Sequence, residues 1–68
     1  MAEKQQDMIL ERIRNSLDQL SERQRMVAQF ILAEYEEAAF LTAAKLAEAS
    51  DVSEATVIRF ANRMGYDR

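Results

Sequence analysis

The sequence predicts an all-α fold, a compact bundle of four to five short helices. The chain of 68 residues has no proline and one glycine, and strong helix formers dominate it. No segment alternates apolar and polar residues with the period of two that a half-buried strand shows. Apolar residues recur instead at helical spacing. Residues 1–68 are therefore expected to form a single domain with a small core.

The first two helices are indicated by an apolar stripe and a capping motif. Ile9, Ile13 and Leu17 recur at intervals of four, which predicts a helix from about residue 4 or 5 to residue 17. Ser21 and Gln24 then fit a capping box, in which the serine hydroxyl accepts a hydrogen bond from the Gln24 N–H and the glutamine side chain reaches back. A second helix is expected to begin directly after Ser21.

A short helical turn over residues 36 to 41 is expected next, and it should return Phe40 and Leu41 to the core. The helices on either side each offer apolar residues at helical spacing. The predicted core consists of Ile9, Ile13, Leu17, Val27, Phe30, Ile31, Leu41, Leu46, Val52, Val57 and Phe60.

Two further helices are indicated by capping residues that lie close together. Thr42 is placed to cap a helix over residues 43 to 50, and Ser53 is placed to cap a helix over residues 54 to 64. So few residues separate these helices that they must cross at a tight turn, which is the arrangement of a helix-turn-helix. The sequence therefore predicts a helix-turn-helix over residues 43 to 64.

The residue types around this turn fit the crossing. Ala47 is small where the second helix must approach the first, and Val52 is apolar where the angle between them must be filled. Val57 and Phe60, three residues apart, are expected to face the first helix. Asp51 stands where glycine is usual, because the backbone at such a turn tends to be left-handed. Aspartate is among the few other residues that tolerate this conformation.

A helical projection of residues 54 to 64 predicts which face meets a ligand. At about 100° per residue, Ala55, Arg59 and Asn62 fall opposite the apolar side. In the major groove of DNA, arginine can grip guanine O6 and N7, and asparagine can pair with adenine. The projection predicts these three residues as base contacts. Periodicity alone also allows Arg59 and Asn62 to be a solvated face.

The flanks of the same helix offer contacts to the DNA backbone. Ser53, Thr56 and Arg63 are predicted to contact phosphates, together with the free N–H groups of the helix N-terminus. For Arg63 the alternative is to neutralise the negative end of the helix dipole. Ile58 has two interpretations as well: contact with a thymine methyl group, or packing on a residue outside this sequence.

The formal net charge of −3 argues mildly against nucleic acid, because DNA-binding modules usually present a basic surface. The charges are partly segregated, however. Glu34, Glu36 and Glu37 cluster in mid-chain, whereas Arg59 and Arg63 lie near the C-terminal end. The three glutamates lack the ligand spacing of a calcium loop, and without histidine or cysteine a transition-metal site is not expected either.

Catalysis and membrane insertion are not expected. The chain has no histidine, no cysteine and no glycine-rich phosphate loop, so neither an enzyme nor a cofactor site is predicted. No apolar run approaches the roughly 20 residues that a membrane span requires, and the polar start is not followed by a signal-peptide core. The sequence favours a cytoplasmic location.

Residues 40 to 60, with the sequence FLTAAKLAEASDVSEATVIRF, resemble the N-terminal domain of RpiR-type bacterial transcription regulators. Residues 52 to 60 are the closest part of the resemblance. The sequences LSERQRMVA at residues 20 to 28 and MGY at residues 64 to 66 are similar as well. Asp51 departs from the glycine that is usual in this family at the turn.

This resemblance implies the DNA-binding domain of a sugar-phosphate-responsive transcriptional regulator. In the family, such a domain is normally followed by a sugar-isomerase (SIS) domain that binds the effector phosphosugar, and residues 1–68 do not encode one. The implied partner is a double-stranded DNA operator. A homodimer or higher homo-oligomer is expected, because one motif spans only a half-site. The alternative is a helical protein–protein interaction module that shares the fold without reading DNA.

Overall fold

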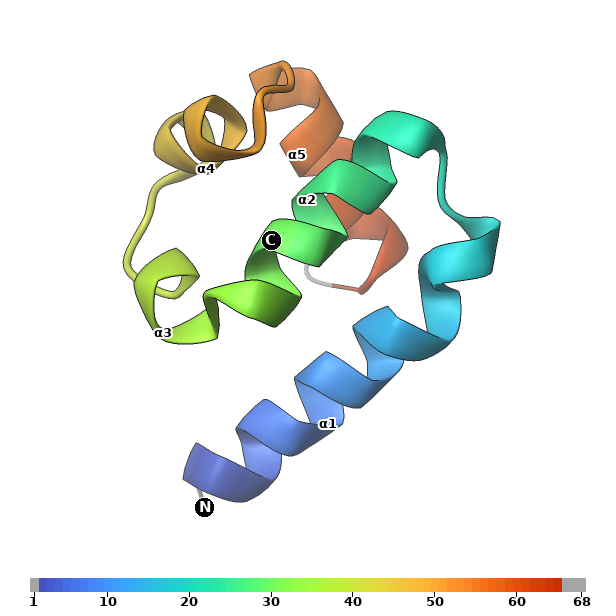
Figure 1. Cartoon of the computed structure of the whole chain (residues 1–68), viewed down its shortest axis with the longest axis vertical. Coiled ribbons are helices and arrows are strands. Elements are labelled where there is room, and N and C mark those ends of the chain that lie inside the picture. The colour runs from blue at the N-terminus through green and yellow to red at the C-terminus, as the bar shows by residue number, and fades with distance from the viewer. Residues whose placement is uncertain (1, 66–68) are drawn as a thin grey trace.

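The computed structural model describes residues 2–65, with side chains from Met8 onward. This part of the chain contains no strand, and its regular elements are all helices joined by short turns and links (Figure 1). Its elements are α1 (Ala2–Ser16), the 3-10 helix η1 (Leu17–Gln19), α2 (Glu22–Ala33), α3 (Tyr35–Ala38), α4 (Ala43–Ser50) and α5 (Glu54–Arg63). The predicted all-α bundle is confirmed.

Helix α2 lies at the centre of the molecule and packs against α1, α3, α4 and α5 (Figure 1). Helices α4 and α5 also pack against each other, and only residues 51 to 53 separate them. The helix-turn-helix is thus supported from behind by α2, while α1 covers another side of α2. This arrangement leaves one face of α5 without a neighbouring helix.

The predicted helix starts at Ser21 and Thr42 are confirmed. Ser21 Oγ accepts a hydrogen bond from Gln24 N at 3.2 Å, and Gln24 Oε1 accepts one from Ser21 N at 3.4 Å, which completes the capping box. Thr42 Oγ1 accepts a hydrogen bond from Lys45 N at 3.1 Å. Each bond satisfies an N–H group that the helix itself leaves without a partner.

The end of the first helix differs from the prediction. Helix α1 ends at Ser16, and Leu17 begins the 3-10 turn. The guanidinium group of Arg25 lies across this turn: Nε donates to Leu17 O at 3.1 Å and Nη2 donates to Leu20 O at 3.1 Å. Arg25 therefore gives Leu17 O a second donor, besides Leu20 N at 3.3 Å, and also pairs with Leu20 O after the turn.

The core is drawn from α1, α2, α4 and α5. Its buried apolar members are Ile13, Leu20, Val27, Ala28, Ala47, Val57, Phe60 and Met64. The partly buried residues packed against it are Ile9, Leu17, Ile31, Leu32, Ala43, Leu46 and Val52. Nine of the eleven predicted core residues belong to one of these two groups.

Phe30 and Leu41 are only half-buried and lie outside the core, and the prediction for Phe40 was wrong. Phe40 is 89% exposed. The helical turn is shorter than expected, since α3 ends at Ala38, and Phe40 lies in the link that leads to α4. On α2, residues three apart are offset by about 60° around the helix axis. Phe30 therefore lies beside the buried face that carries Val27 and not at its centre.

The turn between α4 and α5 has the predicted left-handed geometry at Asp51, with φ 61° and ψ 44°. Val52 N donates to Ala47 O at 3.0 Å, so the turn closes back on α4. Gly65, after the end of α5, has φ 88°. Both helices of the motif are therefore followed by a residue in the conformation that glycine adopts most readily.

Asp51→Gly is expected to raise the free energy of unfolding by up to about 1 kcal/mol, because a left-handed conformation strains a residue that has a Cβ atom. Urea unfolding followed by circular dichroism measures the change. Glu48→Gly is the matched control, since Glu48 is exposed within α4. There the same replacement should lower the stability by about 0.8–1 kcal/mol. A loss of stability in Asp51→Gly would contradict the strain at this turn.

Candidate nucleic-acid interface

Helix α5 is divided sharply into a buried and an exposed face. Thr56 and Val57 are 5% exposed and Phe60 is 4% exposed. The exposed residues of the helix are Glu54, Ala55, Ile58, Arg59, Asn62 and Arg63. Four of them form a continuous line that we call the outer stripe, composed of Ala55, Ile58, Arg59 and Asn62. Their spacing of three and four residues makes them neighbours on the helix surface.

The structure brings the three predicted base contacts together. Ala55, Arg59 and Asn62 are all exposed and occupy the outer stripe, one turn apart. A major groove about 12 Å wide admits a single helix whose outward face carries the contacting side chains. The outer stripe therefore carries a guanidinium group and an amide on its exposed surface, with the small Ala55 at the N-terminal end.

The N-terminus of α5 is organised by Ser53. Its Oγ accepts a hydrogen bond from Thr56 N at 3.2 Å and lies 3.0 Å from Thr56 Oγ1, where either hydroxyl can donate. Ser53 is exposed, whereas Thr56 is buried. The buried Thr56 hydroxyl is thus paired with Ser53, and the phosphate contact of Thr56 remains a prediction. Ser53 and the first N–H groups of α5 are left to face the solvent.

The C-terminal end of α5 is held by an arginine of α1. Arg12 Nη1 on α1 donates to Met64 O at 3.0 Å, across 52 positions of sequence. Arg63, in the last turn of α5, is exposed as predicted. No local pattern could have indicated the Arg12 contact, because the partner is a backbone carbonyl that every residue carries.

Two further basic residues lie near the motif. Arg23 shares a shallow depression with Asp51, which places it beside the turn between α4 and α5. Lys45 is exposed in the first turn of α4 and was not singled out from the sequence. In a helix-turn-helix, the first helix crosses the DNA backbone. A basic residue in the first turn of that helix, here Lys45, is therefore a candidate phosphate contact that the sequence prediction did not include.

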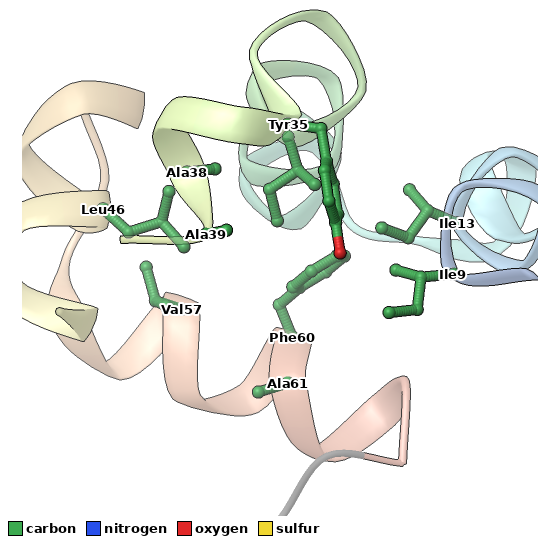
Figure 2. A pocket seen from close by; sticks show the side chains of 10 residues that line it. Ile9, Ile13, Tyr35, Ala38, Ala39, Leu46, Val57, Phe60 and Ala61 are labelled. Atoms are coloured by element: carbon green, nitrogen blue, oxygen red, sulfur yellow. The ribbon is translucent and has the colours of Figure 1, made fainter. Parts of the chain in front are cut away.

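An apolar groove of about 490 Å³ lies on the inner side of α5 (Figure 2). Tyr35 points across it toward Phe60, with Ile9 and Ile13 of α1 to one side. The full lining is Ile9, Ile13, Ile31, Tyr35, Ala38, Ala39, Leu46, Val57, Phe60 and Ala61. Helix α3 thus faces the inner side of α5, whereas the outer stripe lies on the opposite, exposed side of α5.

The acidic cluster is separated from the outer stripe by this arrangement. Glu34, Glu36 and Glu37 are exposed at the start of α3 and just before it. Within residues 2–65, no group of three histidine, cysteine, aspartate or glutamate side chains is arranged to hold a metal ion. The same stretch contains no helix with the length and apolar character of a membrane span. The helix-turn-helix itself is balanced in formal charge, with three basic residues (Lys45, Arg59 and Arg63) and three acidic residues (Glu48, Asp51 and Glu54).

Comparison with known proteins agrees with the geometry. Residues 7–67 match a family described as helix-turn-helix domain, rpiR family. The chain is 42% identical over 57 residues to the HTH-type transcriptional regulator HexR of Pseudomonas aeruginosa, an alignment that covers 84% of this chain and 20% of that protein. The chain thus spans about a fifth of the length of this curated relative. No solved structure matches it.

Proposed function

The chain belongs to the rpiR family of helix-turn-helix domains, and on this basis we propose that it binds duplex DNA sequence-specifically as the DNA-reading part of a transcriptional regulator. Helix α5 enters the major groove. The observation that carries this proposal is the outer stripe, which stays exposed while the opposite face of the same helix forms the core.

Base recognition falls to the polar members of the outer stripe. The guanidinium group of Arg59 is a planar donor that can bind guanine O6 and N7 together, and the amide of Asn62 can bind adenine N6 and N7. Ala55, near the positive end of the helix, has a side chain small enough for the backbone to approach a base edge. Arg59 supplies the strongest discrimination because its contact is both bidentate and charge-assisted.

Phosphate recognition falls to the two ends of α5. When the Thr56 hydroxyl donates to Ser53 Oγ, which is 3.0 Å away, Ser53 keeps its own proton for a phosphate oxygen. The N–H groups of the first turn and the positive end of the helix dipole favour the same anion. Arg63 can reach a phosphate from the other end. These contacts place the helix in the groove without reading sequence.

The remaining proposals concern the regulator as a whole. The family resemblance supports a cytoplasmic homodimer, because two copies of the motif are needed to read two half-sites. It also supports a phosphosugar-binding domain elsewhere in the regulator, whose ligand would change operator affinity. No catalytic step is assigned to residues 1–68.

Binding to duplex DNA as a function of salt tests the proposal. A fluorescently labelled pool of random duplexes is titrated with the chain by anisotropy, and log K is expected to fall with log salt at a slope of about −0.9 for each neutralised phosphate. Selection from the same pool should then enrich one sequence. Absent binding, or binding that ignores salt, would favour the protein-interaction module instead.

Arg63→Ala is expected to weaken binding to every duplex by a similar factor and to make the salt slope shallower by about 0.9, because one phosphate contact is lost. Arg14→Ala is the matched control, since Arg14 is also an exposed arginine and lies on α1. It should leave both quantities unchanged. A loss in Arg63→Ala that depends on the base sequence would contradict the phosphate contact.

A further inference from the structure

We infer that Ile58 is a specificity-determining residue that contacts the C5-methyl group of a thymine in the major groove. The inference rests on the proposed DNA binding and adds a base preference to it. It gives a function to Ile58, whose large side chain belongs to the outer stripe although it can form no hydrogen bond and is not part of the core.

The position of Ile58 carries the first part of the argument. Its side chain is 48% exposed, whereas Val57 beside it is 5% exposed and Phe60 is 4% exposed. Ala55 precedes it by three residues and Asn62 follows it by four, so Ile58 lies between these two residues on the helix surface. Ile58 therefore borders the face that carries Arg59 and Asn62, on the side of Asn62.

A comparison with the other exposed apolar side chains carries the second part. Within the described residues, the large ones are Met8, Met26, Phe40 and Ile58. The first three lie on α1, on α2 and in the link before α4, outside the outer stripe. Only Ile58 stands among residues that can bind bases, so a DNA contact explains its exposure and its placement together.

The chemistry of the contact follows from the side chain. Isoleucine is branched at Cβ and has one preferred rotamer in a helix, so it presents a stiff apolar surface. It gains free energy only when another apolar group covers it. On the major-groove edge of B-DNA that group is the thymine methyl, which cytosine lacks. Ile58 would thus distinguish thymine from cytosine, while Arg59 and Asn62 read purines.

Replacing thymine with deoxyuridine tests the contact, because it removes the methyl group and leaves every hydrogen-bonding group in place. The probe is the duplex that the chain selects from random sequences, with each thymine replaced in turn. The affinity of the unaltered protein should fall by about three- to fivefold at one thymine in each half-site, as expected for one buried methyl group. For Ile58→Ala the fall at that thymine should be absent.

Two controls make the result decisive. Met8→Ala shortens an exposed apolar side chain on α1 and should keep the full deoxyuridine effect. Thermal unfolding is used to check that Ile58→Ala remains folded. If Ile58→Ala keeps the same deoxyuridine penalty at every thymine, or if the selected sequence contains no thymine in the half-site, the contact is refuted while DNA binding stands. If no sequence is selected, the proposed function fails and this inference fails with it.

Discussion

Arg59→Ala is expected to abolish discrimination at one base pair of each half-site and to reduce affinity for the preferred duplex by about 1–3 kcal/mol. The physical reason is that Arg59 is the only guanidinium group on the outer stripe, so its removal leaves a guanine edge without its bidentate donor. Competition binding with the four possible base pairs at each position of the selected duplex measures the effect.

The control for this prediction is Arg59→Lys, which keeps the positive charge but lacks the planar pair of donors. Lysine should restore much of the overall affinity and little of the preference at that base pair. If Arg59→Ala instead weakens all four duplexes equally, Arg59 contacts a phosphate. In that case the assignment of the base-reading residues on α5 is wrong.

Phe60→Ala is expected to unfold a large part of the protein. Phe60 is 4% exposed, belongs to the core and also lines the apolar groove opposite Tyr35. Truncating a buried phenylalanine costs about 3–5 kcal/mol. The total stability of a domain of this size is about 3–10 kcal/mol. Urea or thermal unfolding, followed by circular dichroism, should show a much lower midpoint or no transition.

The chain provides a matched control in Phe40, which is 89% exposed. The same truncation, Phe40→Ala, removes the same atoms from a side chain that contacts mostly solvent. It should change the free energy of unfolding by no more than about 0.5 kcal/mol. Similar losses in the two variants would show that the described core does not govern stability.

Local signals account for what the sequence predicted correctly. The caps at Ser21, Thr42 and Ser53 depend on residues three positions apart, and each hydroxyl accepts the expected backbone N–H. The left-handed turn at Asp51 depends on one residue type at one position. The exposed face of α5 follows from the helical period alone. These features need no knowledge of the rest of the fold.

Features that depend on distant contacts escaped prediction. The bond from Arg12 to Met64 O joins α1 to the end of α5, and nothing in the helical pattern of α1 indicates it. Phe40 was expected inside because it is apolar, but the course of the link after α3 decides its direction. Thr56 lies at the edge between the two faces of α5, where packing against other helices decides burial.

The separation of the two faces of α5 has a consequence for how such domains can change. The residues that fold the helix and the residues of the outer stripe are different sets, since Val57, Phe60 and Met64 are buried whereas every member of the outer stripe is exposed. Substitutions at the outer stripe are therefore nearly neutral for folding. With the base-reading role proposed for these positions, a lineage of duplicated copies would acquire new operators through them, and a library randomised there would retain a common scaffold.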